Sequence, residues 1–300
     1  MSLLILGSAA YDSIETPNDR REKALGGSGV HSAYAARFFT GVQLISVVGD
    51  DWASSDTKLL QDKGIDTKGL ELRQGSKTLA WSGKYFDNMN DRETLDIQLN
   101  VMGQEYNPIV PDSFKDTKFV FLANGGPGIH LSLLKQLHSP QLIVADTMDF
   151  YINNDREMLL ALLTKINGLI LNDSEAKQLT GLPHCISAAQ NILEKGPQFV
   201  IIKKGEHGAM YFSHKEIYLV PAYPTENVVD PTGAGDSFAG GFMGYLSSVK
   251  DLSPQTVKKA LVYATVIASF NVEGFSLERL TDLCPEELEN RFQTFRKMIC

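Results

Sequence analysis

The sequence is poor in cysteine, and the cysteines it has are far apart. Cys185, Cys284 and Cys300 form no C-x-x-C pair, so neither a zinc-finger type of site nor a disulfide framework is expected. A chain of 300 residues can bury a full hydrophobic core without such staples, in one large domain or two smaller ones. The cysteines therefore predict reduced thiols and a cytoplasmic protein.

Long hydrophobic runs are also missing. The longest mostly apolar stretch, ALVYATVIASFNV at residues 260–272, is too short to span a bilayer comfortably. The N-terminal MSLLILGSAAYDS has no basic start, and Gly7 interrupts its apolar run. This pattern predicts a first β-strand and not a signal peptide, so no membrane partner is expected.

Basic clusters are absent too. The chain has 28 basic and 36 acidic residues and a formal net charge of −8, which argues against nucleic acid as a partner. Backbone N–H groups and a metal ion can still bind an anion locally. A phosphate-bearing small molecule is therefore compatible with the composition.

Two common nucleotide-binding motifs do not occur. There is no G-x-x-x-x-G-K-[ST] segment, and the turn after the first expected strand, GSAAYDS, lacks G-x-G-x-x-G. Residues 26–32, GGSGVHS, come close to the second motif, but no clear strand precedes them. These absences disfavour a P-loop enzyme and a dehydrogenase.

What the chain does contain is a regular alternation of short apolar runs and helical patterns. It predicts an α/β fold with a mostly parallel sheet and helices on both faces, and residues 1–300 are expected to form one domain. From Ser237 onward the pattern is almost wholly helical. Strands are expected at residues 3–6, 43–48, 119–122, 142–145, 168–171 and 199–203, and helices at 31–39, 54–63, 156–165 and 188–194.

Residues 77–101 interrupt this alternation. Polar and apolar residues alternate there around a turn-like DNMND, which predicts antiparallel strands that form a small lid, together with residues 10–24. An extra hairpin on the edge of the main sheet is the alternative. Trp81, Tyr85 and Phe86 could close over a sugar, stack on a nucleobase or pair two lids in a homodimer.

The segment DPTGAGDSFAGGF, residues 230–242, combines two carboxylates with a run of small residues before a helix. Gly233 and Gly235 permit backbone angles that other residues resist. Unpaired N–H groups of the first helical turn, with the helix dipole, would bind an anion. Asp236 in the same turn could accept a proton from a hydroxyl that approaches a phosphate. The alternative is an aspartate N-cap after a tight glycine turn.

Several other residues lie at the carboxyl ends of expected parallel strands, where ligands bind in sheets of this kind. These residues are Asp146, the pair Asn172 and Glu175, and the glycines Gly205 and Gly208. Asn172 and Glu175 would equally serve as the N-cap and first-turn acid of the following helix.

Together these segments resemble the ribokinase-like (PfkB) carbohydrate kinases, and the resemblance covers nearly the whole chain. DPTGAGD is similar to the family's C-terminal motif DTxGAGD, and ALGGSGVHSAYAARFF to its N-terminal glycine pair. NDSEAKQLTG resembles the N-x-x-E segment, and FVIIKKGEHGAMYF the strand and loop that carry ATP. The resemblance implies a three-layer α/β/α fold with a mostly parallel sheet and a small β lid.

The resemblance also implies an activity: ATP-dependent phosphorylation of a hydroxymethyl group on a sugar or a similar small molecule. Asp236 would be the catalytic base, and Gly233, Ala234 and Gly235 would form the anion hole for the phosphoryl group. The alternatives are a nucleoside kinase of the same family and, less favoured, a non-catalytic nucleotide or sugar sensor.

The cofactors implied by the resemblance are ATP and Mg²⁺. Asn172 and Glu175 match residues that organise Mg²⁺, partly through water, and Lys203, Gly205 and Gly208 would lie along ATP. KKG here replaces the more usual Thr-Leu-Gly at that strand end. Asp230 and Thr232 fall where some members bind a monovalent cation such as K⁺.

The acceptor side implied by the resemblance consists of Asp12, Gly26, Gly27 and His31. A carboxylate such as Asp12 can bind two vicinal hydroxyls. His31 stands where the family usually has asparagine, which predicts an acceptor pocket unlike that of a typical ribokinase, and a packed or helix-capping histidine is the alternative. Homodimers through the lid are known in the family, so one is expected here.

Overall fold

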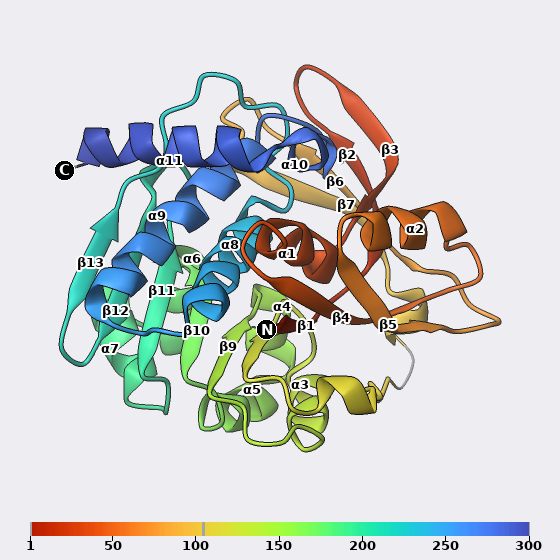
Figure 1. Cartoon of the computed structure of the whole chain (residues 1–300), viewed down its shortest axis with the longest axis horizontal. Coiled ribbons are helices and arrows are strands. Elements are labelled where there is room, and N and C mark those ends of the chain that lie inside the picture. Colours follow the sequence, from red (N-terminus) through yellow and green to blue (C-terminus); the bar gives the residue numbers. More distant parts are fainter. Residues whose placement is uncertain (1, 104–105, 300) are drawn as a thin grey trace.

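The computed structural model describes residues 2–103 and 106–299 (Figure 1). Its main sheet has the strand order β13-β12-β11-β10-β9-β8-β1-β4-β5. Neighbouring strands are parallel, except that β12 runs antiparallel to both β11 and β13. The strands are β1 Ser2–Leu6, β4 Gly41–Val48, β5 Ile65–Leu72, β8 Phe119–Leu122, β9 Leu142–Asp146, β10 Gly168–Asn172, β11 Phe199–Lys203, β12 Ala209–Ser213 and β13 Ile217–Val220.

Helices cover both faces of this sheet, as Figure 1 shows. One hydrophobic core joins the sheet to α1 Ser28–Ala36, α2 Ser54–Asp62, α8 Ala234–Val249, α9 Pro254–Asn271, α10 Glu278–Asp282 and α11 Pro285–Ile299. A second core lies under α3 Pro127–Leu134, α4 Asp149–Asn154, α5 Arg156–Leu163, α6 Asp173–Thr180 and α7 Cys185–Leu193. The three-layer α/β/α prediction is therefore confirmed.

A separate small sheet lies beside the main one. Its strand order is β3-β2-β6-β7, from β2 Ala10–Glu15, β3 Arg20–Gly26, β6 Leu79–Tyr85 and β7 Arg92–Gln98. Residues 10–24 and 77–101 therefore share one sheet, as predicted for the lid. The alternative, a hairpin on the edge of the main sheet, is wrong, because β6 pairs with β2 of the small sheet.

Each strand expected from the sequence is present with its ends within two residues of the expected ones, and several further strands were not expected. The near-miss glycine segment does follow a strand, β3, contrary to expectation. Four of its seven residues are exposed and charged, Arg20 to Lys23, so no apolar pattern marks it. Helix α1 begins at Ser28, three residues before the expected start at His31, because the glycine pair itself forms the turn that leads into the helix.

Glycines within α8 let this helix lie unusually close to α1. A methyl group at Gly240 would lie 2.2 Å from the Ser32 carbonyl oxygen, and one at Gly244 2.8 Å from the Ala36 Cα. Glycine in a helix interior costs about 1 kcal/mol relative to alanine, and here the close approach of two helix backbones explains it. The contact fixes the start of α8, which carries the aspartate of the DPTGAGD segment.

Candidate active site

The DPTGAGD segment, residues 230–236, forms a loop that leads into α8, and we call it the anion loop. Gly233 is the N-cap of α8 and has φ 76°, a left-handed conformation that favours glycine. The Ala234 N–H donates to the Pro231 carbonyl at 3.1 Å. Among the described residues, the N–H groups of Gly235 and Asp236 have no backbone acceptor, so they can bind an anion.

Asp236 is the third residue of α8 and lies beside these N–H groups. The alternative that it is the N-cap is wrong, because Gly233 occupies that position. Ser32 of α1 donates its hydroxyl to the Asp236 carbonyl at 3.1 Å. Burial raises the pKa of the Asp236 carboxyl, while the positive charges of Lys203 and Arg92 act to lower it. A raised pKa makes a carboxylate a better general base.

Asp230 anchors the other end of the anion loop. It is fully buried, and its two carboxylate oxygens accept the N–H groups of Thr232 at 2.8 Å and Ser276 at 3.0 Å. Thr232 donates its hydroxyl to the Tyr85 hydroxyl at 3.1 Å. The small sheet, through Tyr85, is therefore joined directly to the anion loop.

The His31 side chain packs against Gly233 of the anion loop. Its side chain is 1% exposed, and a methyl group at Gly233 would lie 2.3 Å from the Nδ1 atom. Burial lowers the pKa of His31 to about 4, although the negative charge of Asp230 acts to raise it. The ring is therefore neutral. The ring thus packs against the anion loop, as the packed-histidine alternative describes, and the role of His31 at the acceptor pocket stays a prediction.

A cavity of about 480 Å³ opens beside the anion loop, and we call it the donor cavity. Lys203, Gly205 and Gly208 line it, as do Pro231, Ala234 and Gly235 of the anion loop. Gly208 has φ 83°, and a methyl group there would lie 2.1 Å from the Val220 carbonyl oxygen. Lys203, Gly205 and Gly208 therefore share one cavity with Ala234 and Gly235 of the predicted anion hole, whereas Asn172 and Gly233 are not among its lining residues.

Lys203 and Asp146 form an ion pair at this edge of the main sheet. Asp146 ends β9 and Lys203 ends β11, with β10 between them. The Lys203 Nζ lies 2.8 Å from the Asp146 Oδ2, and Asp146 is only 4% exposed. The Asp146 Oδ1 accepts the N–H of Thr147 at 2.7 Å, so both carboxylate oxygens are held.

Asn172 and Glu175 form a capping box at the start of α6. The Asn172 Oδ1 accepts the Glu175 N–H at 2.8 Å, and the Glu175 Oε2 accepts the Asn172 N–H at 2.7 Å. The helix-capping alternative is therefore present in the structure. Burial and the charge of Asp146 raise the pKa of Glu175 to about 7. No group of three or more His, Cys, Asp or Glu side chains that could hold a metal occurs within the described residues.

Asp12, Gly26 and Gly27 lie together on the acceptor side. A methyl group at Gly26 would lie 2.0 Å from the Asp12 Oδ2. Burial raises the pKa of Asp12 to about 7, and the Gly27 N–H and Arg92 oppose this. In the small sheet Asp12 is aligned with Trp81, and Trp81 with Ile97. The three side chains therefore lie on one face of the sheet.

The model of the pfkB family of carbohydrate kinases matches residues 2–280. The chain belongs to the PfkB family. It is accordingly a phosphotransferase that has an alcohol group as acceptor.

Individual members of the PfkB family are similar to the chain over most of its length. It is 27% identical over 256 residues to the cytidine kinase of Thermococcus kodakarensis, which covers 82% of this chain and 88% of that one. It is 25% identical over 298 residues to the deoxyribokinase of Salmonella typhimurium, with 91% and 93% covered. The nucleoside kinase of Burkholderia thailandensis, solved with inosine, has the same fold, with a TM-score of 0.78, 21% identity and 97% of both chains covered.

Two residues near the site of this PfkB kinase had not been predicted. Arg92 is aligned with Tyr85 in the small sheet, and its guanidinium carbon lies 5.2 Å from the centre of the Trp81 ring. Asn90, in the turn before it, lines the donor cavity and donates to the Glu206 Oε1 at 3.0 Å. The sequence contains no specific indication of a role for these two residues. Asn90 lies within the DNMND turn and Arg92 directly after it, and such residues are common in hairpins.

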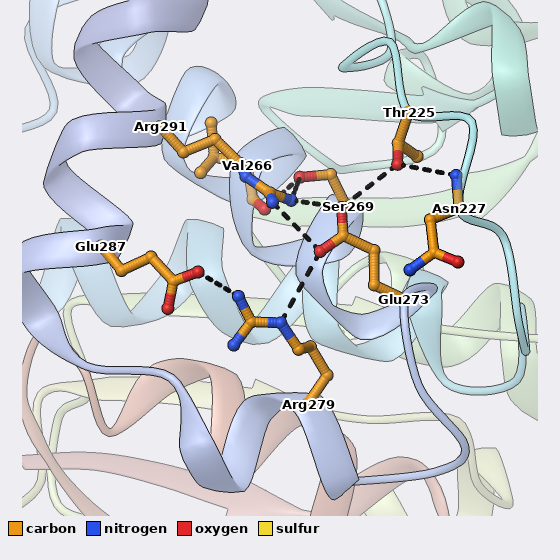
Figure 2. Close-up of polar contacts among 8 residues, drawn as sticks. All are labelled: Thr225, Asn227, Val266, Ser269, Glu273, Arg279, Glu287 and Arg291. Atoms are coloured by element: carbon orange, nitrogen blue, oxygen red, sulfur yellow. Dashed lines mark hydrogen bonds and ion pairs between the residues drawn. The ribbon is translucent and has the colours of Figure 1, made fainter.

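An ion-pair cluster around Glu273, shown in Figure 2, includes two residues of the donor-cavity wall. Arg291 of α11 donates to both Glu273 oxygens, at 2.8 and 3.0 Å, and Thr225 donates to the Oε1 at 3.1 Å. Arg291 also donates to the Ser269 hydroxyl at 3.1 Å. Thr225 and Ser269 line the donor cavity, so the cluster holds two residues of its wall.

No helix among residues 2–103 and 106–299 is long and apolar enough to cross a membrane.

Proposed function

We propose that the protein phosphorylates a hydroxymethyl group of a sugar unit, with Mg·ATP as donor and Asp236 as general base. One observation carries the proposal. Asp236 directly follows Ala234 and Gly235, which line the donor cavity, and its charge acts on the Asp12 carboxyl of the small sheet. A phosphoryl group on the loop and a hydroxyl beside Asp12 would therefore meet at the Asp236 carboxylate.

The reaction itself is a displacement at phosphorus. The acceptor oxygen forms a bond to the γ-phosphorus, the bond from that phosphorus to the β,γ-bridging oxygen breaks, and ADP leaves with the electron pair. The hydroxyl proton passes to Asp236, whose raised pKa suits this role. In the proposed anion hole of Gly233, Ala234 and Gly235, the N–H groups of the two glycines, with that of Asp236, stabilise the charge on the transferred group. Ala234 shapes the turn, because its N–H donates to the Pro231 carbonyl.

The residues present fit a magnesium ion that arrives with ATP. Mg²⁺ keeps several waters and needs few direct protein ligands, so the half-buried Glu175 carboxylate and the Asn172 amide oxygen suffice to hold its water shell. Mg²⁺ would supply charge neutralisation at the phosphates. An E. coli protein assigned as ribokinase II, which has the same fold with a TM-score of 0.77, was solved with ATP and Mg²⁺. Asp230 and Thr232 are proposed for a K⁺ ion because they form a buried acidic corner of the anion loop.

A nucleoside is the second candidate for the acceptor. Trp81 is half-buried and Ile97 is 52% exposed, on the face that bears Asp12. An indole ring and an aliphatic side chain beside a carboxylate suit a base next to a ribose. The naming of one relative as a cytidine kinase agrees with this candidate.

The test is ADP release with Mg·ATP against a panel of sugars and nucleosides. Release is expected with a small group of acceptors. Asp236→Asn should lower the rate by about 10²–10⁴ while ATP binding, measured by calorimetry, persists. Asp112→Asn is the matched control, since that carboxylate is 95% exposed on the surface. Near-normal turnover in Asp236→Asn would remove Asp236 as the base.

A wild-type protein that binds ATP but releases no ADP with any acceptor would favour a nucleotide sensor instead. The pattern of active acceptors decides between the sugar and the nucleoside. If only nucleosides are active, Trp81→Ala should raise their KM, because the base would lose a stacking surface.

A further inference from the structure

The charge of the donor cavity is unusual for a site that should receive a triphosphate. Three carboxylates, Asp146, Glu175 and Asp236, act on the Lys203 ammonium at its anion-loop end. Among the described residues that line the cavity, Lys203 is the only lysine or arginine. Arg92 also acts on Asp236 and Glu175 but does not line the cavity, so Lys203 is the lining cation that can offset the repulsion between these carboxylates and an incoming terminal phosphate.

The position of Lys203 is fixed from two sides. Asp146 holds the ammonium at 2.8 Å, and the Lys203 side chain is 18% exposed. On the opposite side, a methyl group at Gly235 would lie 3.0 Å from the Lys203 Nζ. The ammonium therefore lies against the part of the anion loop whose N–H groups lack backbone acceptors.

This place is at one end of the donor cavity, next to Asp236. Thr225 and Ser269 line the same cavity beside the Glu273 cluster, and Gly205 and Gly208 lie beyond Lys203 along the chain. A nucleotide whose terminal phosphate meets the anion loop thus places that phosphate, and not its base or ribose, against Lys203. A lysine ammonium binds such an oxygen as a compact charge with three donors.

We propose that Lys203 binds the γ-phosphoryl group of the donor nucleotide against the anion loop, and that Asp146 is a positioning residue that holds the Lys203 ammonium there. The inference rests on the proposed kinase function and adds the contact that recognises the group to be transferred.

Calorimetric titration of two nucleotides, both with Mg²⁺, tests the assignment without any knowledge of the acceptor. One is ADP and the other is the β,γ-imido analogue of ATP. In Lys203→Met, affinity for the ATP analogue should fall about 10- to 100-fold, the effect of losing a charge-assisted hydrogen bond, while affinity for ADP changes less than about threefold. Asp146→Asn should show the same selective loss to a smaller degree, because the lysine remains but is no longer held.

Two further variants control for folding and for bulk charge. Lys203→Arg keeps the positive charge beside Asp146 and should retain most of the preference for the ATP analogue, even if Lys203→Met is unstable. Lys204→Met removes the adjacent lysine, which does not line the cavity, and should leave both affinities unchanged. Thermal melts of all variants establish that each is folded under the conditions of the titration.

Equal losses for ADP and the ATP analogue in Lys203→Met would overturn the γ-phosphoryl assignment, as would no loss for either. The failure of the proposed function has a different signature. In that case the wild-type protein binds neither nucleotide, or binds both and transfers no phosphoryl group, whatever the variants do.

Discussion

Two carboxylates of the site, Asp12 and Asp236, have their pKa values raised by burial, yet their surroundings differ. Asp12 accepts the Gly27 N–H and interacts with two like charges, Asp230 and Asp236, besides the cation Arg92. Asp236 lies near two cations, Lys203 and Arg92, which act to lower its pKa. Carboxylates whose environments differ in this way commonly take different roles in one reaction. We assign acceptor binding to Asp12 and proton transfer to Asp236.

The pH dependence of activity should report these carboxylates. The pKa of Asp12 is raised to about 7, so the carboxyl gains a proton as pH falls through about 7 and can no longer accept two hydroxyl hydrogen bonds. We expect kcat/KM for the acceptor to fall by up to about tenfold per pH unit below that point. Rates between pH 5 and 9 check this.

Asp12→Asn provides the comparison, because an amide does not titrate. It should lower kcat/KM at every pH and remove the part of the decline near pH 7 that is due to Asp12, leaving the declines due to Glu175 and Asp236. A wild-type profile that is flat from pH 6 to 8 would contradict the assignment of Asp12.

At the scale of elements, the turn between β6 and β7 is placed to act on the nucleotide side of the site. Asn88, Met89 and Asn90 line the donor cavity, and the hydrogen bond from Asn90 to Glu206 joins this turn to the loop after β11. The small sheet therefore borders both the donor cavity and, through Asp12 and Trp81, the acceptor side.

Removal of this contact should weaken donor binding. Asn90→Ala loses one exposed hydrogen bond worth about 1 kcal/mol, so the KM for ATP should rise about fivefold with kcat little changed. Glu206→Ala should match it, and the double variant should add nothing further. Steady-state kinetics at saturating acceptor measure these effects.

Asn153→Ala is the matched control for the turn. Its side chain accepts a hydrogen bond from Gln178 at 2.8 Å on another part of the surface. An equal rise in KM for that variant would show that the effect of Asn90→Ala is not specific to the turn.

At the scale of the whole molecule, the C-terminal helices are attached to the site through one acidic residue. Glu273 contacts Arg291 of α11 and lies 3.7 Å from the Arg279 Nε of α10, while Arg279 also pairs with Glu287, as Figure 2 shows. The Arg291 guanidinium carbon lies 3.5 Å from the centre of the Phe270 ring. Charge and packing together attach α10 and α11 to the wall of the donor cavity.

Loss of the Glu273 charge should lower the stability of the protein. Glu273→Gln leaves Arg291 largely buried, at 17% exposure, without its carboxylate, and we expect a loss of about 2–4 kcal/mol in the free energy of unfolding. The KM for ATP should rise as well, because Thr225 and Ser269 lose their support. Urea denaturation and kinetics measure the two effects.

Glu22→Gln removes the partner of Arg20 in a surface pair whose side chains are 62% and 69% exposed. Its effect should be at most about 1 kcal/mol. Equal effects of Glu273→Gln and Glu22→Gln would contradict the role of the cluster. The homodimer through the small sheet stays a prediction, which light scattering in solution would test.

The sequence by itself determined the features that depend on neighbouring residues. Short β-branched runs between helical patterns specify parallel βαβ units, and the order of glycines and acids in DPTGAGD specifies a turn into a helix. The resemblance of these segments to one family then supplied the main site residues, since they lie in loops whose backbone conformation the sequence constrains.

Only the tertiary structure decided which distant residues meet. The pairing of Lys203 with Asp146 depends on β9 and β11 lying on either side of β10, and the place of His31 depends on how closely α1 approaches α8. Arg92 and Asn90 gained their positions from the way the small sheet faces the main one. These contacts join segments far apart in the chain, and a local pattern of residues carries no record of the packing that brings such segments together.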